Sequence, residues 1–214
     1  MPMYNIPTGG CALIRLTGKF IDVRDWTLPD QPFFRHWLQP EHEWQKFDGP
    51  YYPASTPAEI EEMIASREAD IVGNSFPTPR HTMAIACKET DKLIGKVSWY
   101  WQGEETNWLC VGVSIFDPSY WGRGLGYEAL GLWTDYILQA NPALVRIGLA
   151  TWSGNTRMLR LAEKLGFRQE ACFRKARIVN GLYYDGMAYG ALREEWEQLY
   201  PQGFAAHLLV SHTL

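Results

Sequence analysis

The stretch that decides the fold is "SYWGRGLGYEAL", Ser119 to Leu130. Glycines stand at the alternate positions 122, 124 and 126, and Arg123 separates the first two. Glycine adds no side chain to a core and is costly to order, so glycines spaced in this way indicate a backbone that bends sharply or lies close against a ligand. A β-rich run ends just before the stretch at Asp117-Pro118, and helical spacing begins just after it. We therefore expect a loop that leads into a helix.

A loop in this position gathers backbone amides at a helix N-terminus, where the helix dipole also favours negative charge. The sequence thus predicts a phosphate site, and the alternative is a tight turn that needs glycine only for its dihedral angles. A nucleotide-hydrolysing P-loop is rejected because no Lys-Ser or Lys-Thr follows Gly126. A dinucleotide fingerprint, G-x-G-x-x-A from Gly124 to Ala129, is the weaker reading because the next strand, Val145 to Thr151, carries no acid for a ribose hydroxyl.

Composition bounds the class of protein. The chain has 214 residues, 46% hydrophobic residues and a net charge of −4, which is typical of one globular domain without a basic face for nucleic acid. No apolar run approaches the roughly 18 residues of a membrane span, and "MPMYNIPTGG" is not a secretory signal, so we expect a cytoplasmic protein without membrane partners. The 4 cysteines and 5 histidines form no CxxC or HExxH spacing, so neither disulfides nor a metal is expected.

Periodicity and turn signals predict an alternation of helices and strands along the chain. Gly166 is expected to end one helix in a left-handed conformation, and Asn180-Gly181 is expected to turn the last hairpin. The C-terminal "FAAHLLVSHTL" fits a strand or a helix equally well. The predicted helices cover 30–38, 56–67, 129–140 and 158–165, and the predicted strands are a hairpin over 82–101, single strands over 107–116 and 145–151, and a hairpin over 172–192.

At family level, "DPSYWGRGLGYEAL" resembles the acyl-coenzyme A binding motif of the GCN5-related N-acetyltransferases (GNAT), [RQ]-x-x-G-x-[GA]. Trp121 stands where the arginine or glutamine is usual, which is similar to the RimJ/RimL-like branch of ribosomal-protein acetyltransferases. "TWSGNTRMLRLAEKLGF" and "FRKARIVNGLYYDGMAYGALREEW" also resemble segments of that branch. The resemblance covers about residues 18–197 and leaves 198–214 unassigned. It implies one N-acetyltransferase domain over 1–214 of the α/β class, with a mixed, mostly antiparallel sheet, helices on both faces, and a splay between strands four and five.

The resemblance also implies a co-substrate, acetyl-CoA or another acyl-CoA, with no metal. Ile115 and Phe116, where strand four leaves strand five, would pair with the pantetheine arm and offer an amide to the thioester oxygen. The implied activity is direct acetyl transfer to a primary amine, either a peptide N-terminus or a small molecule. A non-catalytic acyl-CoA binding or sensing module is the alternative, and monomer or homodimer stays open. The loop residues implied to hold the pyrophosphate are Trp121, Gly122, Arg123, Gly124, Leu125 and Gly126.

Two positions depart from the family pattern. The tyrosine and the serine that often act as acids in relatives are replaced by Ala162 and Met158. Asn155 matches the family asparagine, so the resemblance implies that it bonds the pantetheine or a water, while a helix N-cap would explain it equally well. Tyr183 and Tyr184 are the remaining acid candidates, although tyrosines on a strand often pack in a core.

The N-terminal third is rich in aromatic residues with acids between them. Such a mixture fits a pocket for a cationic amine beside an apolar wall, and it also fits a small helical core. The aromatic residues are Trp26, Trp37, Trp44, Phe47, Tyr51 and Tyr52, and the acids are Glu41, Glu43 and Asp48.

Overall fold

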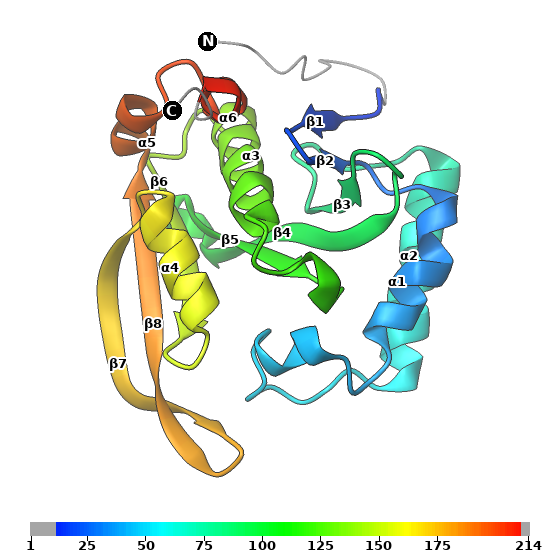
Figure 1. The fold of residues 1–214 in the computed structure, drawn as a ribbon, viewed down its shortest axis with the longest axis horizontal. Coiled ribbons are helices and arrows are strands. Elements are labelled where there is room, and N and C mark those ends of the chain that lie inside the picture. The colour runs from blue at the N-terminus through cyan, green and yellow to red at the C-terminus, as the bar shows by residue number, and fades with distance from the viewer. Residues whose placement is uncertain (1–11, 211–214) are drawn as a thin grey trace.

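The computed structural model describes residues 12–210. Cys11, the N-terminal stretch examined for a signal, and the last part of the C-terminal segment lie outside these residues. The described residues form an eight-stranded sheet in the order β1-β2-β3-β4-β5-β6-β8-β7 (Figure 1). Its strands are β1 (Arg15–Thr17), β2 (Ile21–Arg24), β3 (Thr82–Cys87), β4 (Leu93–Gly103), β5 (Trp108–Ile115), β6 (Arg146–Trp152), β7 (Arg168–Val179) and β8 (Leu182–Leu192).

The principal helices are α1 (Gln31–Leu38), α2 (Pro57–Gly73), α3 (Leu125–Ala140), α4 (Thr156–Lys164), α5 (Arg193–Leu199) and α6 (Phe204–Val210). The helices α1 to α4 lie between strands near the places predicted for helices, whereas α5 and α6 follow the last strand. Short 3-10 turns lie at η1 (Leu28–Asp30), η2 (Glu43–Lys46), η3 (Glu104–Thr106) and η4 (Pro118–Tyr120). None of the helices within residues 12–210 is long and apolar enough to cross a membrane.

The sheet is mostly antiparallel, and its one parallel pair among the described strands is β5 with β6. These two strands pair only at Leu109 with Ile147 and at Cys110 with Gly148. Beyond those positions the described parts of β5 and β6 diverge. Because β5 carries Ile115, this is the splay that the sequence predicts between strands four and five, and it begins several residues earlier than Ile115.

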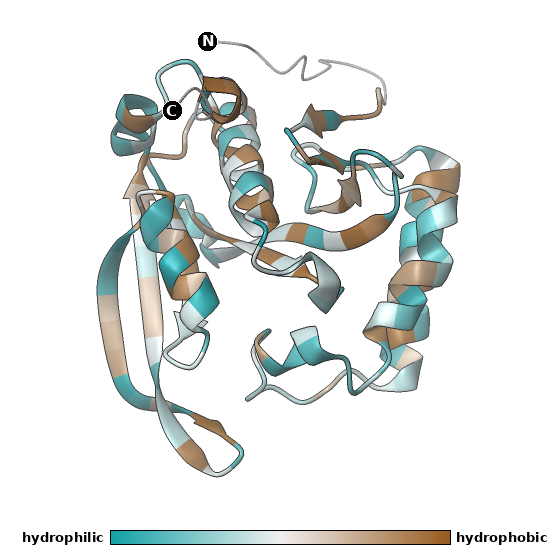
Figure 2. Ribbon diagram, viewed as in Figure 1, coloured by the Kyte–Doolittle hydropathy of each residue, from teal (hydrophilic) through white to brown (hydrophobic). Residues whose placement is uncertain are grey.

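Two hydrophobic clusters cover opposite faces of the sheet. The larger cluster lies beneath α3 and α4 and includes Val111 and the fully buried Trp133. The smaller one lies beneath α1 and α2 and includes Phe34 and Phe116. Because side chains alternate between faces along an extended chain, Val111 on β5 and Phe116 directly after β5 place the two clusters on opposite sides. Helices therefore cover both faces, as expected, and apolar stripes mark α1 and α2 in Figure 2.

Local signals explain the ends of several elements. Asn180 and Gly181 turn the last hairpin with φ of 50° and 77°, and Gly166 ends α4 with φ of 88°, so both predictions are confirmed. The helix α2 extends to Gly73, beyond the expected end at Arg67, because no glycine or proline stops it earlier.

The C-terminal segment is a helix rather than a strand over its described part. Phe204 at the start of α6 is fully buried, and a Cβ added at Gly131 of α3 would lie only 2.1 Å from its ring. A glycine at position 131 thus lets α6 pack directly onto α3. The larger hydrophobic cluster includes Phe204 and Leu208, so α6 belongs to the same fold.

Candidate functional site

The glycine loop ends at the N-terminus of α3. Gly122 and Gly124 have φ of 75° and 78°, the left-handed region that favours glycine. A Cβ added at either position would meet nothing within 4 Å, so the requirement for glycine comes from the backbone angle and the outer side of the loop is open. The amides that follow in the first turn of α3 have no acceptor within the helix. The loop therefore offers open amides at the positive end of a 16-residue helix.

This loop forms one wall of a cleft of about 680 Å³. The opposite wall is α4, and the floor is the edge of β5 that β6 leaves unpaired. A segment that follows α1, residues 44–51, closes the cleft from below in the view of Figure 1, and we call it the 44–51 segment. The fold thus brings the predicted phosphate loop and the predicted splay into one site.

The direction of the β5 backbone decides which of its groups face the cleft. Phe116 donates its amide to the carbonyl of Ile94 on β4 at 2.8 Å, and backbone groups alternate in direction along a strand. Val111, Val113 and Ile115 therefore direct their amides and carbonyls to the splay. The expectation for Phe116 is corrected, because its amide belongs to the β4–β5 ladder and its side chain is fully buried in the smaller cluster.

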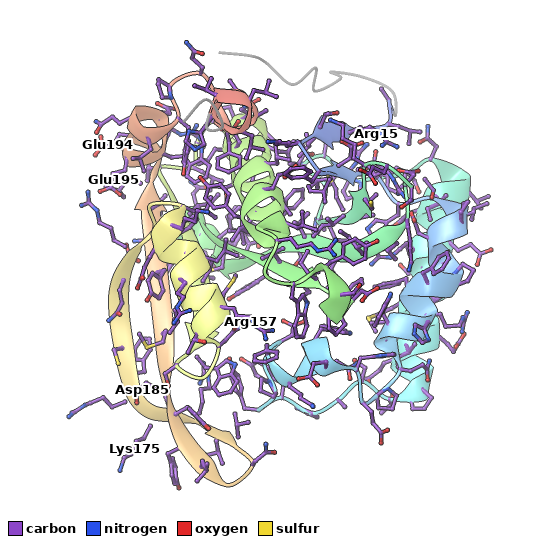
Figure 3. All side chains as sticks on the ribbon, viewed as in Figure 1. Arg15, Arg157, Lys175, Asp185, Glu194 and Glu195 are labelled. Carbon is purple, nitrogen blue, oxygen red and sulfur yellow. The ribbon has the colours of Figure 1, made fainter. Side chains whose placement is uncertain are left out.

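Trp121 ties the loop to this strand edge. Its indole nitrogen donates to the Ile115 carbonyl at 2.9 Å, so this carbonyl already has a partner. The ring also lies 4.3 Å from the guanidinium of Arg157, which in turn lies 4.8 Å from the Phe47 ring. Arg157 of α4 thus stacks between the glycine loop and the 44–51 segment (Figure 3). Arg157 is not among the site residues predicted from the sequence.

Arg123 lies on the other side of the loop. Its guanidinium is 5.7 Å from the Tyr120 ring, and it lines a second cavity of about 410 Å³ together with Lys19 and Lys88. Leu125 lines both cavities, and Gly126 lines the cleft. The expected residues from Trp121 to Gly126 are therefore divided, with Arg123 facing away from the cleft.

Asn155 lies where the 44–51 segment meets α4. Its side-chain oxygen accepts from the Met158 amide at 3.2 Å, so the predicted helix N-cap is confirmed. Its side-chain nitrogen donates to the Phe47 carbonyl at 3.2 Å, and the indole of Trp152 donates to the same carbonyl at 3.2 Å. Asn155 thus holds the segment against α4, and a ligand contact for it stays a prediction.

Comparison with known proteins identifies the family to which this chain belongs. A model of the acetyltransferase (GNAT) domain matches residues 21–168, which include β2 to β6, the glycine loop and α4. The chain belongs to the GNAT acetyltransferase family.

Among its relatives is the uncharacterized N-acetyltransferase YokL, derived from the SPbeta prophage of Bacillus subtilis, which is 28% identical over 113 residues. That alignment covers 53% of this chain and 63% of the relative, so the chain spans less than two thirds of that protein. A GNAT-family acetyltransferase structure from Bacillus anthracis superposes with a TM-score of 0.66 at 19% identity, covering 85% of this chain and 100% of that one. The ribosomal-protein-S5-alanine acetyltransferase of Vibrio fischeri gives a TM-score of 0.64 at 19% identity, over 86% and 98% of the two chains. At these identities the structures share the fold.

At the two positions where relatives often carry a catalytic acid, this GNAT protein has apolar residues, and both of them lie in apolar surroundings. Ala162 is fully buried, and Met158 packs against the larger cluster while lining the cleft. Tyr183 is 63% exposed on β8, so it is neither in the core nor in the cleft lining. Tyr184 packs edge-on against Trp152 at 4.8 Å, behind the lining rather than in it. A catalytic role for either tyrosine stays a prediction.

The aromatic residues of the N-terminal third are divided between the smaller core and the lining of the cleft, and a pocket for a cationic amine stays a prediction. Trp26 belongs to the smaller core with α1 and α2, and Trp44 shares that core while lining the cleft. Phe47, Asp48 and Tyr51 line the cleft. Glu41 and Glu43, the other two acids of this third, do not line the cleft. Tyr52 is 68% exposed, and Glu43 pairs with Lys46 at 2.6 Å.

Two polar residues of the cleft floor, Lys96 and Ser114, were not identified from the sequence. Lys96 of β4 pairs in register with Ser114 of β5, and the Ser114 hydroxyl donates to the Asp48 carboxylate at 3.3 Å. Burial lowers the pKa of the Lys96 ammonium, Asp48 opposes this change, and Arg67 of α2 adds to it. The available signal was the alternation Lys96, Ser98, Tyr100, which places three polar side chains on one face of a strand.

The described cysteines and acids form neither a disulfide nor a metal cluster. Cys87, Cys110 and Cys172 are free thiols. Within residues 12–210 no group of three or more histidine, cysteine, aspartate or glutamate side chains is arranged to hold a metal ion.

Proposed function

We propose that this GNAT acetyltransferase binds acetyl-CoA, or another acyl-CoA, in the 680 Å³ cleft and transfers the acyl group directly to a primary amine. The observation that supports this proposal is the convergence of the glycine loop, the unpaired edge of β5 and α4 on one cleft. The open left-handed turn at Gly122 and Gly124 would hold the pyrophosphate with the first amides of α3.

The pantetheine arm would lie along the unpaired edge of β5. Val111 and Val113 direct their backbone groups there, so the arm can pair with them as an added strand would. A strand amide close to the thioester oxygen would stabilise the negative charge that develops on it, an effect worth roughly 3 kcal/mol at measured sites of this type. Holding amine and thioester together supplies much of the remaining rate enhancement.

The acceptor amine would enter between the 44–51 segment and the cleft floor. Asp48 supplies a carboxylate for a cationic amine, and Phe47 with Tyr51 supplies an aromatic wall. A peptide N-terminus and a small-molecule amine both fit this chemistry. A peptide is favoured by the likeness to the ribosomal-protein-S5-alanine acetyltransferase, which also suggests a RimJ/RimL-like enzyme. We place the enzyme in the cytoplasm, as a monomer or a homodimer.

A second candidate function is a non-catalytic acyl-CoA binding or sensing module. It is supported by Ala162 and Met158, which replace both of the usual catalytic acids. Catalytic turnover distinguishes the acyltransferase from the sensing module. The test is release of free thiol from acetyl-CoA in the presence of a panel of N-terminal peptides, polyamines, amino sugars and amino acids. Thiol release with at least one amine supports the enzyme, whereas tight binding of acetyl-CoA without thiol release from any amine supports the sensing module.

A further inference from the structure

The cleft floor carries a polar strip on an otherwise apolar face of the sheet. Around the smaller cluster this face presents Ala84, Leu93 and Phe116 beneath α1 and α2. Towards the cleft the same face instead presents Lys96 from β4 and Ser114 from β5. The change from apolar to polar coincides with the start of the cleft, which Lys96 and Ser114 line. The strip therefore faces whatever occupies the acceptor side.

Lys96 is the cation of this strip. It is partly buried and lines the cleft, and among the described residues no hydrogen bond or salt bridge reaches its ammonium group. Asp48 lies close enough to act on its charge without forming a salt bridge, and its carboxylate already accepts from Ser114. An amine group and a carboxylate thus border the same space without neutralising each other directly.

The other titratable groups around Lys96 come from neighbouring elements. Arg67 approaches from α2, where its guanidinium stacks 3.9 Å from the Trp26 ring, and burial lowers its own pKa to about 10. Tyr100 follows on β4, and Tyr51 follows Asp48 on the 44–51 segment, and both line the cleft. Burial raises the pKa of Tyr100, so this phenol stays neutral. Asp48 is then the nearby anion that opposes loss of the Lys96 proton.

We propose that Lys96 is the proton acceptor of the transfer, with its neutral amine receiving a proton from the acceptor ammonium that Asp48 holds beside it. The proposal rests on the proposed function. It deepens that function because it identifies a primary ammonium as the form in which the acceptor binds.

The step balances without any further reactant. One N–H bond of the acceptor ammonium breaks and its proton forms a bond to Lys96 Nζ, which leaves a neutral amine with a free electron pair. That pair forms the C–N bond to the thioester carbonyl carbon, and the C–S bond breaks with its electrons on sulfur. The thiolate takes the second amine proton, and Lys96 returns its proton to solvent. The products are the amide, the free thiol and one proton.

Lysine suits this task when its surroundings disfavour the charged form. A base is most effective when its pKa lies near the working pH, and burial is the usual means of lowering a lysine into that range. Here burial lowers the pKa of Lys96, with Arg67 acting in the same direction. The competing possibility is that Lys96 remains a permanent cation that binds an anionic group of the acceptor.

The first experiment measures Lys96 in the intact protein without any acceptor. Trace labelling with acetic anhydride from pH 6 to 11, read by mass spectrometry, reports when each lysine becomes neutral. We expect Lys96 to react at lower pH than the exposed Lys92, which serves as the internal reference. The Asp48→Asn variant should move the Lys96 midpoint lower still, because Asp48 favours the charged form. A Lys96 midpoint at or above that of Lys92 would overturn the proposal, whatever the enzyme's activity.

The second experiment uses an amine that the thiol-release panel identifies. Lys96→Met and Lys96→Arg should both lower kcat by about a hundredfold or more, because neither side chain can accept the proton. The affinity for acetyl-CoA, measured by calorimetry, should stay unchanged, and Lys92→Arg controls for loss of a lysine elsewhere. Retained activity in Lys96→Arg would overturn the base and assign Lys96 to an anionic group of the acceptor. Absence of thiol release by the parent with every amine would instead refute the proposed function, and the labelling result would still decide the state of Lys96.

Discussion

The side-chain nitrogen of Asn155 donates to the carbonyl oxygen of Phe47 at 3.2 Å, although the two residues are 108 positions apart. The same asparagine caps α4 through its oxygen. One side chain therefore fixes both the start of α4, on the side that we propose for acyl-CoA, and the 44–51 segment, on the side that we propose for the acceptor. Arg157, the second residue of α4, adds a second link by stacking between Phe47 and Trp121.

Two substitutions of Asn155 should distinguish its role as the cap of α4 from its bond to the 44–51 segment. Asn155→Ala removes the cap and the bond to Phe47, so we expect about 1 kcal/mol lower stability and a rate about tenfold to a hundredfold lower. Asn155→Asp keeps a good cap but places a carboxylate against the Phe47 carbonyl. Its melting temperature should stay near that of the parent while its rate falls as in Asn155→Ala. Equal rates in Asn155→Asp and the parent would show that the bond to Phe47 does not position the acceptor side.

The glycine loop can be tested with a pair of variants that differ only in charge. Asparagine and aspartate both tolerate the left-handed conformation at Gly124, and a side chain there enters open space. We expect Gly124→Asp to weaken binding of coenzyme A far more than Gly124→Asn, because a carboxylate would repel the pyrophosphate. Calorimetry with coenzyme A gives the affinities, and thermal unfolding checks the fold. Similar affinities in the two variants would argue against a phosphate at this loop.

Ligand linkage gives a simpler test of the same loop. A molecule that binds only the folded state raises its melting temperature, by an amount that grows with the logarithm of the ligand concentration relative to Kd. Coenzyme A should therefore stabilise the protein against heat, while NAD and ATP at equal concentration should do so much less. Equal shifts with all three would mean that the cleft recognises a nucleotide in general rather than the pantetheine arm.

The order of the elements and the glycine loop could be predicted from the sequence because each depends on residues that are close in the chain. Helical spacing, the Asn180-Gly181 turn and the left-handed Gly166 are such local signals. The direction of the Phe116 amide depends instead on its pairing with Ile94, and the place of Arg123 depends on the second cavity beside β2 and β3. Lys96 and Ser114 of the cleft floor were not predicted for a similar reason. They lie on two different strands, and only tertiary packing brings them together with Asp48, which the sequence did indicate.

Asp135 should make stability depend on pH. Its carboxylate on α3 is 6% exposed and accepts from the Trp196 indole and the Phe204 amide, both at 3.1 Å. Burial raises the pKa of Asp135 above its ordinary value in spite of these bonds. The folded state thus holds a proton that the unfolded state has lost above about pH 4. Its contribution to stability is full below that pH and declines as the pH rises through the folded pKa.

Urea unfolding of the parent and Asp135→Asn from pH 4 to 8 measures this contribution. Asparagine offers a single acceptor oxygen, so one of the two buried donors loses its partner, at a cost of about 1–3 kcal/mol. We expect the parent's advantage to be largest near pH 4 and to shrink with rising pH. Parallel stability curves for the two proteins would show that Asp135 does not titrate differently in the folded state.

The departure of the thiolate provides the last prediction. Because Ala162 and Met158 cannot donate a proton, and Tyr183 and Tyr184 do not line the cleft, no side chain at these positions should need to stay protonated. A thiol with a pKa near 8.5 leaves with little help. The rate of acyl transfer should therefore rise with pH as the base becomes neutral and then level off, and Tyr183→Phe and Tyr184→Phe should follow the parent. If Lys96 is that base, Asp48→Asn should shift the rise to lower pH without changing its shape. A falling alkaline limb that disappears in one of the tyrosine variants would identify that tyrosine as the acid and refute a transfer without one.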